Sequence, residues 1–307
     1  MPPFSSILAS NALINDTNAP QISVFAGGTS GIGKLTIKAL VSTGASVKIY
    51  LIGRPSAASS MKLFINGLNA LNPKAEIIWL EGEISLLADV KRICRIIKNR
   101  EKSVDLLFLT AGYAPFGPRE ETVEGLEVVQ SLEYYSRVLF TLLLLPLLRE
   151  RDGGRVVSVL SGGVERTKWA DGTMTFDKLA SENPGVTFIH SWPGLVNTGN
   201  SKRGNPGWLL GWFLYLVLEP ALWLFSMSDE VSGQRNLFLS TSAAFGGRGI
   251  RWEGKRAVNS MGKEEDGLFL VNYKCDCTPN QKAVSVLREK GQGKIWEHTQ
   301  EVLRSYL

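Results

Sequence analysis

Short apolar runs alternate with helical stretches along most of this chain, and this alternation limits its fold more than any other feature. The first run, Ile22 to Ala26, is followed by a glycine-rich turn and then by a stretch with helical periodicity. Strands that are apolar on both faces and are joined by helices form a parallel sheet that helices cover on both sides. The sequence therefore predicts an α/β fold with a doubly wound parallel sheet.

The predicted elements extend from residue 22 almost to the C-terminus. Strands are expected at 22–26, 46–52, 76–80, 104–109, 155–160, 186–191 and 268–272. Helices are expected at 31–42, 59–71, 88–98, 120–149 with a kink before Pro146, 172–181 and 229–240, followed by two amphipathic helices after Pro279. These elements divide the chain into an N-terminal extension (1–20), a Rossmann domain (21–275) and a helical C-terminal extension (276–307).

Composition and charge exclude several classes of protein. The 307 residues are 44% hydrophobic and 21% charged, which excludes a disordered or fibrous chain. The net charge of +5 includes no long basic run, so we expect no nucleic-acid partner. Three cysteines and two histidines are too few for a disulfide framework or a clear metal site. The first twenty residues lack the pattern of a signal peptide, so an intracellular, cytoplasmic protein is expected.

The run Ala26-Gly-Gly-Thr-Ser-Gly-Ile-Gly33 lies between the first predicted strand and its helix. Glycines at this point let the chain turn sharply and approach a phosphate group closely. The N-terminus of the following helix offers unpaired N–H groups and the positive end of its dipole to the phosphate. The placement of the run after a first strand indicates a site for a dinucleotide.

At these residues the chain resembles the short-chain dehydrogenase/reductase family, and the resemblance covers about residues 20 to 275. Gly27, Gly31 and Gly33 match the family's glycine spacing, with Ala26 in place of a threonine. Further matches are Thr110-Ala111-Gly112 after the fourth strand, the run from Arg155 to Ser161, and Pro193-Gly-Leu-Val-Asn-Thr198. The resemblance implies cofactor contacts from Ser30, Ile32, Ala111, Gly112, Val196 and Thr198, and a carbonyl-binding role for Ser161.

The end of the second strand indicates which dinucleotide is preferred. The segment Leu51-Ile-Gly-Arg54 has no acidic residue to accept a ribose 2′-hydroxyl, and Arg54 is a cation where a 2′-phosphate would lie. NADP(H) is therefore favoured over NAD(H), with an ordinary exposed arginine as the alternative. Glu83 stands where the family commonly places an aspartate against the adenine.

The catalytic pattern of the family is incomplete in this chain. The family uses a tyrosine as proton donor, with a lysine four residues later, and none of the seven tyrosines has a lysine at that spacing. Read without gaps from Ser161, Met174 falls in the tyrosine position and Lys178 in the lysine position. Glu133 falls in the position of the family's asparagine. The segment 162–185 is short for a crossover, so we infer a deletion relative to the family, natural or from a faulty transcript.

Four residues stay open as substitutes for the missing tyrosine. Lys178 could act directly, Glu133 could act through a water, and Tyr134 or Tyr135 could point inward; packing roles for the tyrosines and a surface position for the lysine are the alternative. Loss of a general acid typically costs 10²- to 10⁴-fold in rate. Ser161 and Lys178 are the predicted catalytic residues.

A very apolar stretch lies at 208–227, within an expected lid at 204–228. It contains one charged residue, and Glu219-Pro220 interrupts it, so we expect two short helices rather than a membrane span. An apolar lid suits a bulky lipophilic substrate. Contact of 208–227 with a membrane surface, giving a peripheral membrane protein, and assembly into a homo-oligomer both stay open.

Three functions follow from these residues. The first is an NADP(H)-dependent oxidoreductase that reduces a ketone, or oxidises an alcohol, on a lipophilic small molecule; the chain is similar to fungal members associated with secondary metabolism. The second is a catalytically impaired relative that binds a dinucleotide or a partner. The third is an enzyme that uses the pocket for isomerisation or dehydration without a cofactor.

Overall fold

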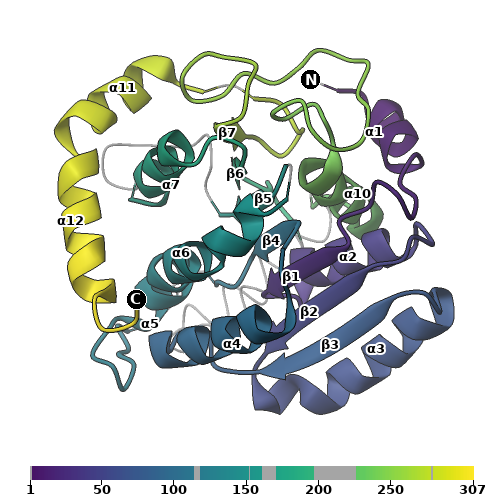
Figure 1. The fold of residues 1–307 in the computed structure, drawn as a ribbon, viewed down its shortest axis with the longest axis horizontal. Helices are drawn as coiled ribbons and strands as arrows, with labels where there is room; N and C mark the ends of the chain where they lie inside the picture. The colour runs from purple at the N-terminus through teal and green to yellow at the C-terminus, as the bar shows by residue number, and fades with distance from the viewer. Residues whose placement is uncertain (1, 114–117, 152, 161–170, 197–225, 278) are drawn as a thin grey trace.

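The computed structural model describes residues 2–113, 118–151, 153–160, 171–196, 226–277 and 279–307, and these ranges contain one seven-stranded sheet (Figure 1). The order of the strands is β3-β2-β1-β4-β5-β6-β7, and every neighbouring pair is parallel. The strand order changes direction between β1 and β4, which is where doubly wound sheets bind ligands. The predicted doubly wound α/β fold is confirmed.

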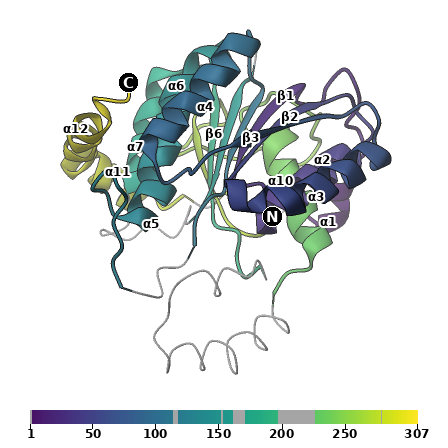
Figure 2. The same ribbon diagram turned by 90° about the horizontal axis from the view of Figure 1, so that it is seen from below.

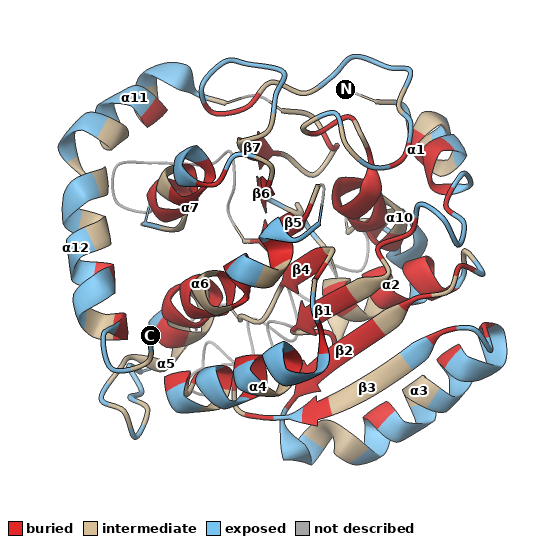
Figure 3. Cartoon of the chain, in the orientation of Figure 1, coloured by how far each residue is buried: buried red, intermediate tan, exposed pale blue. Residues whose placement is uncertain are grey.

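The strands occupy the predicted runs, with small differences at their ends. Their bounds are β1 Ile22–Ala26, β2 Lys48–Gly53, β3 Glu76–Glu81, β4 Leu106–Leu109, β5 Arg155–Val159, β6 Thr187–Ser191 and β7 Leu268–Val271. Six of them are apolar and buried along most of their length, whereas β3 at the edge is more exposed (Figure 3). Burial on both faces explains why their sequences do not alternate between apolar and polar residues.

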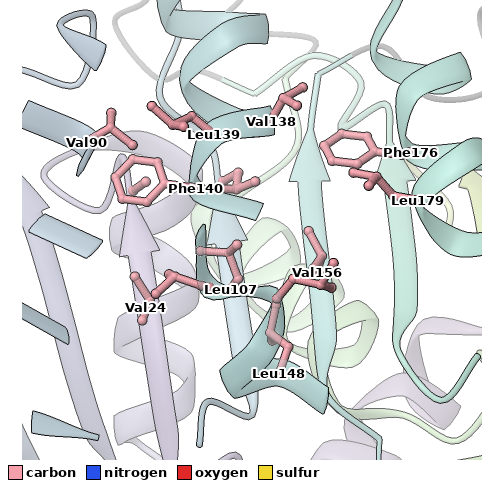
Figure 4. Close-up of a cluster of buried hydrophobic side chains, with 14 of the residues drawn as sticks. Val24, Val90, Leu107, Val138, Leu139, Phe140, Leu148, Val156, Phe176 and Leu179 are labelled. Carbon is pink, nitrogen blue, oxygen red and sulfur yellow. The ribbon is translucent and has the colours of Figure 1, made fainter. Parts of the chain in front are cut away.

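Helices cover the sheet on both faces, as Figure 2 shows. On one face lie α4 (Leu87–Arg100), α6 (Ser136–Arg149) and α7 (Asp171–Glu182). On the other lie α2 (Gly31–Val41), α3 (Ala58–Leu71) and α10 (Asp229–Thr241). The first face includes Val24, Leu107 and Val156 from three strands, packed beneath side chains of α6 and α7 (Figure 4). Each face thus has its own hydrophobic core, and the sheet separates the two.

The N-terminal segment contains a helix that the sequence analysis did not predict. This helix, α1 (Phe4–Asn11), packs against α10 and buries Ile7 completely. The Asn11 side-chain amide donates hydrogen bonds to the backbone and side-chain oxygens of Gln234 on α10. Eight residues are too few to form a stable helix alone, so this helix depends on its contact with α10.

The long helix expected over 120–149 begins eight residues later, which corrects that prediction. Residues 120–127 instead form a turn in which Gly125 has a φ of +75° and Glu121 bridges to Glu127. The Glu127 carboxylate accepts a hydrogen bond from the N–H of Gln130 and caps the helix. The helix proper consists of α5 (Val128–Gln130), a π-helical turn (Ser131–Tyr135) and α6, with Pro146 inside α6.

This continuous helix, Val128–Arg149, is long and apolar enough to cross a membrane, but most of it is buried between β4, β5 and the neighbouring helices. Its apolar composition therefore reflects its place in the core. Pro146 lies inside α6, and the kink expected before it stays a prediction. The π-helical turn at Ser131–Tyr135 is an irregularity that the sequence did not predict, because an insertion of this kind disturbs the regular hydrogen-bond pattern.

The C-terminal extension forms two amphipathic helices, α11 (Gln281–Lys290) and α12 (Gln292–Leu303), which pack against α7 (Figure 1). Asp177 of α7 is buried and receives both hydrogen bonds of the Arg288 guanidinium, each at 2.8 Å. Ser260 and Gln292 donate to the same carboxylate. One buried carboxylate thus joins α7 to both C-terminal helices and to the loop before β7.

Candidate active site

The turn after β1 brings the backbone very close to the loop after β4. Gly27 has a φ of +105°, and a β-carbon built on it would lie 2.3 Å from the backbone nitrogen of Ala111. A β-carbon on Gly33 would lie 2.4 Å from the carbonyl oxygen of Gly27. Both positions therefore require glycine, one for the close approach of two loops and one for the packing of α2 against the turn.

A cleft of about 540 Å³ opens at the carboxyl ends of the strands. Eight predicted cofactor contacts line it: Gly27, Ser30, Gly31, Ile32, Arg54, Glu83, Ala111 and Gly112. The other described contacts lie elsewhere: Gly33 is buried inside the first turn of α2, and Val196 forms a bridge with Met227. The structure thus brings most of the predicted dinucleotide site together in one place.

A larger cavity, of about 770 Å³, lies between α1 and the segment 251–258. None of the predicted site residues that the structure describes lines it. The smaller cleft at the strand ends is therefore the candidate active site.

Arg54 lies at the end of β2 and exposes its side chain at one end of the cleft. Gly53 directly before it packs under Thr29 and Trp79, where a β-carbon would lie 2.4 Å from the Thr29 methyl group. Glu83 follows β3, and its carboxylate accepts hydrogen bonds from the backbone and hydroxyl of Ser85. The cleft therefore carries one cation at the end of β2 and one carboxylate at the end of β3.

A buried arginine that the sequence analysis did not single out fixes the middle of the cleft. The Arg137 guanidinium donates to the carbonyl oxygens of Ala111 and Val159, at 2.7 and 2.9 Å, and to the Ser158 hydroxyl at 2.8 Å. Burial lowers the pKa of Arg137 to about 10, against the opposing effect of the nearby Glu133 carboxylate. The side chain therefore clamps the carboxyl ends of β4 and β5 together.

Glu133 faces the cleft from the π-helical turn. Its Oε1 atom accepts a hydrogen bond from the backbone N–H of Tyr113 at 2.9 Å, and a β-carbon on Gly112 would lie 2.6 Å from the same oxygen. Burial raises the pKa of the Glu133 carboxyl, while Arg137 and the Tyr113 N–H partly oppose this rise and Glu127 adds to it. The site therefore contains a partly buried carboxyl with a raised pKa, as functional carboxyls often have.

Three of the other candidate proton donors lie outside the cleft. The Tyr134 hydroxyl bonds to Thr175 and Thr299, at 2.7 and 2.5 Å, and the Tyr135 hydroxyl bonds to Nε2 of His298. Both tyrosines thus point toward α7 and α12, in agreement with a packing role. Lys178 forms an ion pair with Glu182 and lies over the Trp296 ring, so the structure does not bring this predicted catalytic residue into the cleft.

Met174, which falls in the position of the family's tyrosine when the sequence is read without gaps from Ser161, is completely buried in the hydrophobic core. The helix that carries it, α7, corresponds to the one expected at 172–181. Ser161, Thr198 and residues 204–225 of the expected lid lie outside the residues that the structure describes, as do residues 208–225 of the apolar stretch.

The described residues fit a dinucleotide. The cradle formed by Gly27 and Gly33 leaves no space for a side chain, and α2 begins at the cleft with no acidic residue in its first turn. The first N–H groups of a helix have no partner within the helix, so they can bind a phosphate. Thr110 strengthens the cradle, because its hydroxyl donates to the Gly27 carbonyl oxygen at 2.9 Å.

A doubly wound parallel sheet with such a cradle after its first strand defines a dinucleotide-binding protein of the Rossmann type. A family model described as short chain dehydrogenase matches residues 21–171. Oxidoreductase AN1596 of Emericella nidulans is 33% identical, over 98% of this chain and 97% of that relative. The chain therefore belongs to the short-chain dehydrogenase family, as its sequence motifs indicate.

A further relative agrees with this assignment, and a solved structure shares the fold. Short-chain dehydrogenase/reductase SAT2 of Stachybotrys chartarum is 26% identical, over 91% of this chain and 90% of that relative. The solved structure of L-sorbose reductase from Gluconobacter frateurii, in complex with NADPH and L-sorbose, has a TM-score of 0.55. The match covers 74% of this chain and 92% of the reductase chain. At 18% sequence identity, it shows a similarity of fold alone. The protein is an oxidoreductase of this family with fungal relatives.

Proposed function

We propose that the protein is an NADP(H)-dependent oxidoreductase that reduces a ketone, or oxidises an alcohol, on a lipophilic small molecule. The observation that carries the proposal is that the glycine cradle and Arg54 line the same cleft. When bound, the cofactor supplies or accepts the hydride. The residues around the cradle would hold its pyrophosphate, and Arg54 would hold its 2′-phosphate.

The charge pattern supports NADP(H) over NAD(H). The described part of the cleft has the cation Arg54 directly after β2, where enzymes that bind NAD place a carboxylate for the ribose hydroxyls. Glu83, at the end of the neighbouring strand, would contact the adenine. Solved relatives of this fold include structures with NADP and NADPH, which is consistent with this preference.

The alternative, a relative that binds a dinucleotide without catalysis, rests on the missing tyrosine. The position of Lys178 outside the cleft also fits this alternative. We favour the oxidoreductase because another titratable group, the Glu133 carboxyl, does line the cleft. The association with fungal secondary metabolism, the lipophilic substrate and the contact with a membrane surface remain predictions from the sequence.

A thermal-denaturation titration with NADPH and with NADH tests the cofactor. At 100 times the dissociation constant, NADPH should stabilise the fold by about 2.7 kcal/mol. The Arg54→Gln variant should bind NADPH at least about tenfold more weakly, since a charge-assisted bond contributes about 1.5–3 kcal/mol, and should bind NADH unchanged. Arg95→Gln, on the exposed side of α4, is the matched control and should behave as the wild type. Equal stabilisation by both dinucleotides would refute the preference, and stabilisation by neither would refute the proposed function.

A further inference from the structure

We propose that Glu133 donates the proton to the substrate oxygen in this cleft, in place of the tyrosine that the chain lacks. The inference rests on the proposed function, since it assigns a role within the same reaction. It comes from three independent features of the described residues: where the other candidates point, how the π-helical turn orients Glu133, and which charges surround the carboxyl.

The Glu133 side chain points in a different direction from the side chains of the two residues that follow it. Tyr134 and Tyr135 are held from outside the cleft by Thr175, Thr299 and His298. Glu133 directly precedes them, yet it lines the cleft and contacts the loop after β4. The π-helical turn widens the helix at this point, and such turns are frequent at functional sites. The anchored tyrosines thus fix the turn, and the turn presents the carboxyl to the cleft.

The carboxyl has one oxygen engaged and one available. Oε1 accepts the Tyr113 N–H at 2.9 Å, whereas Oε2 makes no hydrogen bond with any residue that the structure describes. A protonated carboxyl carries its proton on one oxygen and can donate from it while the other oxygen accepts. Glu133 can therefore keep its bond to Tyr113 and donate from Oε2 to an oxygen in the cleft.

The groups that face the carboxyl are suited to both of its charge states. Arg137 lies one turn further along the helix, Glu127 lies at the start of the helix, and Tyr113 comes from the loop after β4. Burial and Glu127 favour the protonated form, and Arg137 with the Tyr113 N–H stabilises the carboxylate left after proton transfer. Arg137 is itself held by backbone carbonyls, so it remains in place while Glu133 changes charge.

In the reduction, the carbonyl carbon gains a hydride and the carbonyl oxygen gains the proton of Glu133. The carbon–oxygen π bond breaks, the C–H and O–H bonds of the alcohol form, and the dinucleotide is the species oxidised. Glu133 then regains a proton from solvent. In alcohol oxidation the carboxylate accepts the hydroxyl proton instead. The carboxyl must thus be protonated for reduction and ionised for oxidation.

The test compares the wild type with Glu133→Gln, which keeps the acceptor for the Tyr113 N–H but cannot supply an acidic proton. Glu127→Gln is the matched control, because it removes a nearby carboxylate that does not line the cleft. NADPH oxidation is followed with 1-tetralone and 9,10-phenanthrenequinone as probes, across pH 5 to 9. Dissociation constants for NADPH are measured separately, by thermal denaturation.

We expect Glu133→Gln to lower kcat for reduction by about 10²- to 10⁴-fold with NADPH affinity within about threefold of the wild type. In the wild type the reduction rate should fall as pH rises through the pKa of Glu133, and the variant should lose this dependence. In NADPH-bound protein, the infrared band of a protonated carboxyl should be present below the pKa of Glu133, should disappear over the same pH range as the reduction rate, and should be absent from Glu133→Gln. The Glu127→Gln control should keep the activity and the pH-dependent step, with that step moved to lower pH because the Glu127 charge contributes to the raised pKa of Glu133.

Four results would overturn the proposal or the function on which it rests. If Glu133→Gln keeps the wild-type rate and pH profile, Glu133 is not the donor although the enzyme is a reductase. If Tyr113→Phe, and not Glu133→Gln, removes the pH-dependent step, the hydroxyl of Tyr113 is the donor. If the wild type binds NADPH but turns over neither probe in either direction, the proposed reaction and the role of Glu133 fail together. If the wild type does not bind NADPH, the cofactor assignment fails, and the role of Glu133 fails with it.

Discussion

Gly27 lies so close to Ala111 that a β-carbon would approach the Ala111 backbone nitrogen to 2.3 Å. The two residues belong to the loops after β1 and β4, which are neighbours in the sheet. Their contact therefore closes the floor of the cleft at the point where the direction of the strand order changes. A glycine with a φ of +105° is what permits this approach.

Gly27→Ala should separate these two loops. The added methyl group meets backbone atoms, which cannot move aside as a flexible side chain can, so we expect a loss of about 2 kcal/mol or more in unfolding free energy. NADPH binding should weaken by more than tenfold. Gly44→Ala is the matched control, since Gly44 also has a positive φ, of +74°, but has open space around it. Urea denaturation and NADPH titration of both variants check this prediction, and equal effects in the two would contradict it.

Arg137→Met should damage both the fold and the cleft. The substitution leaves the carbonyl oxygens of Ala111 and Val159 without their buried donor, which should cost about 3 kcal/mol of stability. Arg155→Met is a matched control, because Arg155 is equally buried and donates to four backbone carbonyls away from the cleft.

Both arginine variants should lower the unfolding free energy, whereas only Arg137→Met should weaken NADPH binding at a temperature where both are folded. Denaturant unfolding and a binding titration separate the two effects. A similar loss of NADPH affinity in Arg155→Met would mean that general destabilisation, and not the clamp at the strand ends, explains the result.

Tyr134→Phe should affect stability without affecting the cofactor. The hydroxyl bonds to Thr175 and Thr299 in the buried contact between the π-helical turn, α7 and α12. Removal of the hydroxyl should lower the free energy of unfolding by about 1–2 kcal/mol, because the Thr175 and Thr299 hydroxyls each lose a buried hydrogen bond. NADPH affinity should remain that of the wild type. A large loss of NADPH affinity would show that this tyrosine acts in the cleft.

Asp177→Asn should destabilise the contact between α7 and the C-terminal helices by about 3 kcal/mol at pH 7. Burial alone would raise the pKa of Asp177, but hydrogen bonds from Arg288, Ser260 and Gln292 outweigh it and hold the pKa below its usual value. The ionised carboxylate therefore stabilises the fold above the unfolded-state pKa, about 3.9, and this contribution is lost as pH falls through the lower folded-state pKa.

The measurement for Asp177 is the unfolding free energy of wild type and variant between pH 7 and pH 2. The difference between them should be constant at neutral pH and should shrink below about pH 4. Glu182→Gln is the control on the same helix, because its ion pair with Lys178 is exposed and should contribute less than about 1 kcal/mol. A pH-independent difference for Asp177→Asn would show that the charge is not what stabilises the contact.

Local patterns in the sequence were sufficient for the sheet and the glycine cradle. Apolar runs such as Ile22–Ala26 predict buried strands because both faces of a central parallel strand meet helices. The spacing of Gly27, Gly31 and Gly33 predicts the cradle because its backbone geometry depends on residues a few positions apart. The position of Arg54 directly after β2 likewise predicts its place in the cleft, because the carboxyl ends of neighbouring parallel strands meet at one edge of the sheet.

Contacts between distant segments decided the rest. Helix α1 forms against α10, the start of α5 depends on the turn at Gly125, and Tyr134 and Tyr135 turn away from the cleft because Thr299 and His298 of α12 bond to them. Arg137 could not be recognised as a clamp, since its carbonyl partners come from β5 and the loop after β4 and carry no signal in their side chains. The direction of a side chain is set by its long-range partners, and so only the tertiary structure could separate Glu133 from its neighbours.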